Sequence, residues 1–173
     1  MAGRSRTAPR LACALVVAAL MPVAAAHAAI VRVGRQPAHP VGARFVGALP
    51  ATTRMHVTVA LRPRDPAALA TYARAVATPG SASYRHYLTP SQFARRFGAT
   101  AAQIRAVRRS LRARGLRTGA PSRGGLSIPV MATAARLERA FAVSLTRMAL
   151  PGRRAAIASS APPAVPAAMA GAI

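Results

Sequence analysis

The sequence predicts an α+β fold, in the form of a ferredoxin-like antiparallel sheet with helices packed on one face and a helical insert. Short segments with alternating apolar residues occur before residue 62 and again after residue 115. Between them lie three segments with helix-capping signals, and a fourth such segment follows near residue 133. The resulting order is strand, helical insert, strand, strand, helix, strand, which is the order of a split β-α-β sandwich.

The first 28 residues have the three parts of a secretory signal peptide. Three arginines between residues 4 and 10 precede an apolar run from Leu11 to Val23, and Ala26-His27-Ala28 is a small-residue cleavage site. The apolar run is short for a membrane span. We expect cleavage after Ala28, secretion, and only transient contact with a membrane; an uncleaved anchor is the alternative.

The next segment, residues 29–54, contains several glycines and prolines without a hydrophobic period, and we expect an extended lead-in. The folded domain is expected over residues 55–150. It begins with a half-buried strand, because Val57, Val59 and Leu61 alternate with more polar residues.

A helix is expected after this strand. Asp65 can cap it, and Pro66 suits the first helical position, where a missing N–H costs nothing. Leu69, Tyr72 and Val76 form one apolar stripe along it. A Thr-Pro-Gly turn then ends the helix.

Two capping boxes of the form T-x-x-Q follow, and each predicts the start of a helix. The first pairs Thr89 with Gln92, and its helix is expected to end at Gly98. The second pairs Thr100 with Gln103. A cap of this kind contributes about 1 kcal/mol, so the region is locally well specified.

The helix that begins after Thr100 is expected to end at Gly115 in a Schellman motif, with Leu111 and Leu116 in contact. A short strand from Leu116 to Thr118 follows it.

The remaining elements are a strand, a helix and a strand. Residues 126–130 alternate, and Pro129, which cannot donate to a ladder, predicts an edge strand or the end of the strand. Thr133 is expected to cap a short helix, and Val143–Met148 to form the last strand. Residues 151–173 are rich in proline and alanine and are predicted to be a linker.

The charge is extreme, with 25 basic and two acidic residues and a net charge of +23. Every basic residue is arginine, which beside abundant alanine, glycine and proline favours a compositional bias on a solvated surface. A basic surface that meets an acidic protein partner is the second interpretation. Nucleic acid or an anionic membrane is a weaker one; the signal peptide and the lack of basic clusters with interleaved exposed aromatics speak against nucleic acid. The single cysteine, Cys13, lies in the signal segment, so the exported chain is expected to lack disulfides.

One segment carries a resemblance to a known family. Residues 84–90 read Y-R-H-Y-L-T-P, and F-A-R-R-F-G follows at residues 93–98. Together with the segments 57–65, 79–81, 137–141 and 165–169, this motif resembles the activation domain of the sedolisin (kumamolisin-like) serine-carboxyl peptidases, over roughly residues 42–173. The motif residues are Tyr84, Arg85, His86, Tyr87, Leu88, Thr89, Pro90, Phe93, Phe97 and Gly98.

The resemblance implies a pro-segment that templates the folding of a peptidase and covers its cleft until acid releases it. The implied partner is a sedolisin-type catalytic domain, in the same chain or in another. The family's Glu, Asp, Asp and Ser constellation, its G-T-S motif and its calcium site have no counterpart in these residues. Asp65 and Glu138 are the two acidic residues, so paired-carboxylate chemistry is barely possible. We expect no catalytic residue, no cofactor and no metal site.

Two side-chain interpretations stay open. His86 is expected to be partly buried and to orient its turn; the alternative is a pH sensor, since histidine titrates near neutral pH. Tyr84, Tyr87, Phe93 and Phe97 are expected in the core rather than on a ligand platform. A polyanion-binding protein and a stand-alone protease inhibitor acting in trans remain alternative functions.

Overall fold

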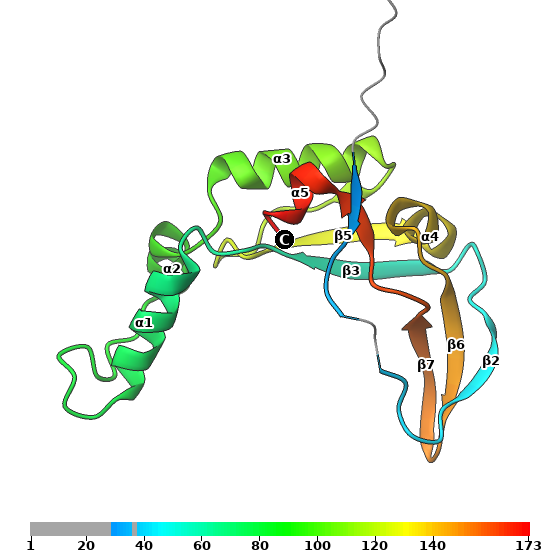
Figure 1. Ribbon diagram of the computed structural model, residues 1–173, viewed down its shortest axis with the longest axis horizontal. Helices are drawn as coiled ribbons and strands as arrows, with labels where there is room; N and C mark the ends of the chain where they lie inside the picture. The colour runs from blue at the N-terminus through cyan, green and yellow to red at the C-terminus, as the bar shows by residue number, and fades with distance from the viewer. Residues whose placement is uncertain (1–28, 36–37) are drawn as a thin grey trace, which may run out of the picture.

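The computed structural model describes residues 29–35 and 38–173, so the predicted signal peptide and its cleavage site at Ala28 lie outside the described residues. No helix in these described ranges is long and apolar enough to cross a membrane. The elements in chain order are β1 (Ile30–Arg32), β2 (Arg44–Ala48), β3 (Arg54–Ala60), α1 (Pro66–Ala77), α2 (Pro90–Arg96), α3 (Ala101–Ala113), β4 (Arg117–Thr118), β5 (Ser127–Thr133), α4 (Ala134–Phe141), β6 (Leu145–Leu150), β7 (Arg153–Ser159), β8 (Ala164–Pro166) and α5 (Ala167–Ala170) (Figure 1).

The central sheet has the order β3-β5-β4 and is antiparallel throughout. β5 pairs along its whole length with β3, from Ser127 opposite Ala60 to Thr133 opposite Arg54. Because side chains alternate across a strand, Ile128 and Val130 point to one face, where both are fully buried. The opposite face of the sheet carries the more polar residues.

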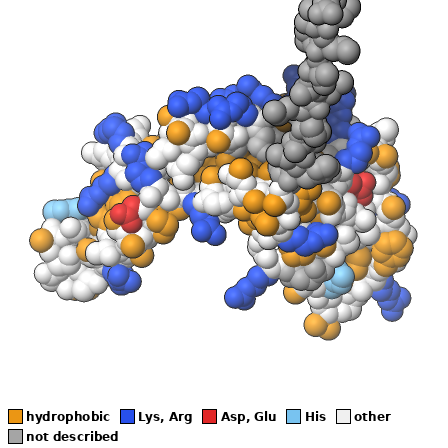
Figure 2. All heavy atoms as spheres, turned by 45° about the horizontal axis from the view of Figure 1, so that its top comes forward, with side chains coloured by type: hydrophobic (Ala, Val, Ile, Leu, Met, Phe, Trp, Pro, Cys, Tyr) orange, Lys and Arg blue, Asp and Glu red, His pale blue; other side chains and the backbone are white. Residues whose placement is uncertain are grey.

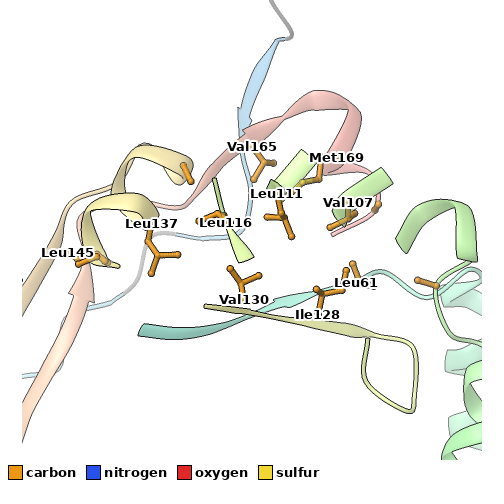
Figure 3. Packing of buried hydrophobic residues seen from close by; sticks show 14 of the residues in the cluster. Leu61, Val107, Leu111, Leu116, Ile128, Val130, Leu137, Leu145, Val165 and Met169 are labelled. Atoms are coloured by element: carbon orange, nitrogen blue, oxygen red, sulfur yellow. The ribbon is translucent and has the colours of Figure 1, made fainter. Parts of the chain in front are cut away.

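Helices α3, α4 and α5 lie on the buried face of this sheet, above it in Figure 1. The core forms where their apolar residues meet the strands: Val107 and Leu111 of α3, Leu137 of α4, and Met169 of α5 (Figure 3). Helix α3 ends in a Schellman motif, in which Leu116 N donates to Leu111 O at 3.1 Å. The predicted end of this helix is therefore confirmed. The α+β class with antiparallel sheets is confirmed as well, and the arrangement is consistent with a ferredoxin-like fold.

The described strands are divided among three small sheets rather than one. β6 does not join the free edge of β3; it pairs with β2 and β7 in a second sheet, which projects from the body in Figure 1. β1 and β8 form a third sheet of two strands. β6 is therefore not the last strand, contrary to the sequence-based expectation.

The segments predicted as lead-in and linker both contribute structure. Residues 29–54 contain β1 and β2, and residues 151–173 contain β7, β8 and α5. The second segment also supplies the core residues Val165, 1% exposed, and Met169, 3% exposed. The linker prediction is therefore corrected: apolar residues of this segment fill the core, and β8 finds its pairing partner in the distant β1.

Pro129 lies in the central strand of its sheet, not at an edge or a strand end as predicted. Its carbonyl accepts a hydrogen bond from Gly119 N at 2.9 Å, just beyond the two residues of β4. In an antiparallel pair, the N–H and C=O of one residue point to the same side. The missing donor of Pro129 therefore faces the point where β4 ends, and it costs the ladder with β3 nothing.

Helices α1 and α2 form an arm on the other side of the body from the β2-β6-β7 sheet (Figure 1). Helix α1 buries Val76, and α2 buries no residue. The arm joins the body at Phe97 and Gly98, where Arg64 Nε donates to Gly98 O at 2.8 Å. The helical insert predicted from the sequence comprises α1, α2 and α3; only α1 and α2 form this arm, whereas α3 packs on the core.

Candidate docking site

No described element covers the outer face of the β3-β5-β4 sheet. All described helices near the sheet lie on its other side, and the arm and the β2-β6-β7 sheet flank the uncovered face in Figure 1. Met131, in the middle of this face, is 47% exposed although it is large and apolar. We call this surface the outer sheet face; it comprises Arg54, His56, Thr58, Ala60, Arg117, Ser127, Pro129, Met131 and Thr133.

One end of the outer sheet face is hollowed. The hollow has a volume of ≈ 510 Å³. Its lining includes three arginines from different elements, Arg54 of β3, Arg117 of β4 and Arg136 of α4. His56 and Met131 complete its floor, and the cross-strand register places both in one row with Arg117. We call it the arginine hollow.

Both acidic residues of the chain are engaged elsewhere. Asp65 Oδ1 accepts from Ala68 N at 2.8 Å, and Glu138 Oε1 accepts from Leu145 N at 2.7 Å. Neither of them lines the arginine hollow. The hollow therefore holds positive charge without a carboxylate of its own chain.

Several other arginines stabilise the fold. Their side chains donate hydrogen bonds to backbone carbonyls rather than to carboxylates. Arg62 Nε donates to Ile173 O at 3.1 Å, and Arg32 Nη1 donates to Pro162 O at 2.7 Å. Arg114 Nη1 donates to the carbonyls of Ala140 and Ala164, which joins α3 to α4 and β8. Some arginines thus hold distant parts of the chain together, and arginine side chains also lie over the solvent side of α3 (Figure 2).

A second feature lies along the free edge of β3. Ala134 N donates to Thr53 O, and Leu61 N donates to Leu126 O, both at 2.8 Å, so odd-numbered residues of this segment bond to β5. By the alternation of an antiparallel pair, the backbone groups of Thr58 and Ala60 face the free edge. An apolar groove of ≈ 370 Å³ runs beside it, lined in part by Phe141 and Ile173.

The family motif lies on the arm and its loop, away from the arginine hollow. Phe97 is 1% exposed and packs against the rings of Tyr72 and Phe93, at centroid distances of 5.4 and 5.6 Å. Tyr87, by contrast, is 75% exposed, so the prediction of a core position is wrong for this residue. It belongs to the loop between α1 and α2, outside the ring cluster around Phe97.

The loop that carries Tyr84 to Leu88 has an unusual backbone. Arg85 has a φ of 61°, in the left-handed region that non-glycine residues rarely adopt. Arg85 N donates to Val76 O at 3.0 Å, and Tyr72 Oη donates to the carbonyl of His86. The side chain of His86 is exposed, not partly buried as expected; its carbonyl, rather than its ring, fastens the turn.

The predicted helix caps are present in three of four cases. Asp65 caps α1, and Thr89 and Thr100 begin α2 and α3 in complete capping boxes with Gln92 and Gln103. Thr133 occupies the cap position of α4, but its side chain makes no capping hydrogen bond. Thr133 is also the last residue of β5, paired with Arg54, and this strand geometry positions it instead.

Within the described ranges, no group of three or more His, Cys, Asp or Glu side chains is placed to hold a metal ion. The arrangement offers a bare sheet face, a positive hollow and an open strand edge, and these are features suited to binding a protein.

Comparison with known proteins agrees with this. The family model described as the pro-kumamolisin activation domain matches residues 41–173. Xanthomonalisin from Xanthomonas sp. (strain T-22) is 40% identical over 124 residues, which are 72% of this chain and 15% of xanthomonalisin. Sedolisin from Pseudomonas sp. (strain 101) is 36% identical over 111 residues, 64% of this chain and 19% of sedolisin. The chain thus spans less than a fifth of either relative.

The fold is that of an α+β domain with antiparallel sheets, in which no described helix covers the outer sheet face. The chain belongs to the pro-kumamolisin activation domain family, as its motif residues predicted.

The sequence alone did not identify the arginine hollow. Arg54, Arg117 and Arg136 are far apart in the chain, and nothing in the sequence distinguishes them from the other arginines among the 25 basic residues. One signal was available: Arg54 and His56 alternate with the apolar residues of β3, which places both on its polar face.

Proposed function

We propose that this chain is the secreted propeptide domain of a sedolisin-type peptidase, which acts as its folding template and as an inhibitor released by acid. The observation that carries the proposal is an activation domain whose described helices cover only one face of its central sheet. This face carries arginine and histidine side chains together with the half-exposed Met131, so it offers a partner both charge and apolar surface.

Docking would bury the outer sheet face against the catalytic domain. A stable interface of this kind buries about 800 Å² on each partner. If the domain binds the folded catalytic domain and not the unfolded one, binding stabilises the folded form. The domain can therefore act as a template for folding. The same contact, placed over or beside the substrate cleft, would exclude substrate.

The charge of the chain supports release by acid. A net charge of +23 with all described carboxylates engaged favours association with a partner that displays carboxylates. Acid protonates the partner's carboxylates and removes that attraction, while the arginines stay charged. Binding should therefore be strong near neutral pH and should weaken as the pH falls.

We further propose that the domain has no catalytic activity of its own and reaches the extracellular space through its N-terminal signal segment. The two carboxylates cap and brace the fold, which leaves no acid-base pair for hydrolysis. Action in trans on a separately encoded peptidase would use the same surface.

The test uses the catalytic domain of xanthomonalisin, refolded and assayed with and without the full chain. We expect a higher yield of active enzyme after refolding, and inhibition near neutral pH that is lost in acid. Inhibition that persists unchanged in acid would remove the release mechanism. If the chain neither inhibits nor aids refolding but binds DNA or heparin at about 150 mM salt, the polyanion-binding alternative replaces the proposal.

A further inference from the structure

We propose that the arginine hollow is a docking site for a cluster of carboxylate side chains on the peptidase. This inference rests on the proposed function and assigns the contact to three residues, Arg54, Arg117 and Arg136. It predicts that charge recognition is local, not spread over all 25 basic residues of the chain.

The three arginines line one hollow because of the fold, although they are far apart in the sequence. Arg117 lies opposite Met131, and Met131 lies opposite His56, so one row crosses all three strands. Arg54 is opposite Thr133, the residue after which α4 begins, and Arg136 follows in the first turn of that helix. All of them line one hollow.

This placement leaves positive charge in the hollow without a counter-charge from the chain. Three like charges around one hollow repel each other, and no carboxylate of the chain lines it. In contrast to Arg62, Arg64 and Arg114, the side chains of Arg54, Arg117 and Arg136 make no hydrogen bond to another described residue. They are free to bind a partner.

The chemistry of the lining favours carboxylates carried on a protein. Arginine binds a carboxylate with two parallel hydrogen bonds, and three arginines can hold more than one such group. The volume of ≈ 510 Å³ exceeds what a single small anion fills. The exposed thioether of Met131 on the floor offers apolar contact for the methylene groups of aspartate or glutamate side chains, and methionine adapts to irregular surfaces.

The first experiment compares two variants with equal loss of charge. One full-length variant carries Arg54→Gln, Arg117→Gln and Arg136→Gln. The control carries Arg105→Gln, Arg109→Gln and Arg123→Gln, three exposed arginines outside the hollow. Affinity for the xanthomonalisin catalytic domain should fall about 100-fold for the hollow variant and less than about threefold for the control. Equal losses would show that only net charge acts, and would overturn the inference.

The second experiment does not need the peptidase. The full chain, labelled with ¹⁵N, is titrated with citrate as a tricarboxylate probe and with inorganic phosphate as a comparison. Citrate should shift the side-chain Nε–H signals of Arg54, Arg117 and Arg136 and leave those of Arg105, Arg109 and Arg123 unchanged. Uniform shifts, or tighter binding of phosphate than of citrate, would overturn the carboxylate assignment.

The two experiments separate the inference from the proposed function. If the chain inhibits the peptidase and the hollow variant inhibits equally well, the proposed function stands and the inference fails. If citrate binds in the hollow but the chain does not bind the peptidase, the carboxylate site stands and the proposed function fails.

Discussion

Helices α2 and α3 begin in the same way and are held in different ways. Each starts with a threonine whose hydroxyl and whose partner glutamine form a complete capping box. Yet α3 buries Val107 and Leu111 in the core, whereas α2 has no buried residue. The difference teaches that a cap determines where a helix starts, while burial determines how firmly it is held.

The largest effect should come from the core of the body. Leu111→Ala removes a fully buried side chain, 0% exposed, and should lower the free energy of unfolding by about 2–5 kcal/mol. Urea denaturation followed by circular dichroism measures this. Arg109→Ala, on the exposed side of the same helix, is the matched control and should change stability by less than about 0.5 kcal/mol. Equal effects would mean that α3 is not packed as described.

The next effect should come from the junction between arm and body. A Cβ at Gly98 would lie 2.6 Å from Ala94 O and 3.0 Å from Gly124 O, both backbone atoms that cannot move aside cheaply. Gly98→Ala should therefore cost about 1–3 kcal/mol of unfolding free energy. Gly171→Ala has open space around its Cβ and ordinary helical backbone, so it should be nearly neutral. A neutral Gly98→Ala would contradict the close approach.

Removing each capping box in turn compares the stability of α3 with that of α2 directly. Thr100→Ala should lower the global free energy of unfolding by about 1 kcal/mol, because α3 is part of the core. Thr89→Ala should leave the global transition almost unchanged and speed amide hydrogen exchange within α2 only. Equal shifts of the global transition in both variants would show that arm and body unfold as one unit.

The smallest effect is expected at the fourth predicted cap. Thr133 makes no capping hydrogen bond, so Thr133→Ala should change the unfolding free energy by less than about 0.5 kcal/mol. A loss near 1 kcal/mol would indicate that the hydroxyl caps α4 in solution.

Local signals explain which parts of the fold the sequence could predict. The starts of α1, α2 and α3 follow from Asp65, Thr89 and Thr100, because a cap depends on residues within one turn. The family and the fold class followed from motif and element order. The pairing of β8 with β1 could not be predicted, since it joins residues about 130 positions apart.

The candidate site was less predictable for the same reason. The outer sheet face is defined by the register of three strands, and register depends on tertiary packing. The arginine hollow depends in addition on the position of α4, which supplies Arg136. Tyr87 shows that a motif rich in aromatic residues does not place every ring in a core: Phe97 is buried, whereas Tyr87 lies exposed in a loop.

The outer sheet face can be tested by thiol labelling. In a Cys13→Ser background, Thr58→Cys places one thiol on this face, and Arg109→Cys places one on the exposed side of α3. Bound to the xanthomonalisin catalytic domain, the thiol at position 58 should react with a maleimide at least about tenfold more slowly than in the free chain, because a docked interface excludes solvent. The thiol at position 109 should react equally in both states. Unchanged labelling at position 58, in a complex that still inhibits the peptidase, would contradict docking through this face.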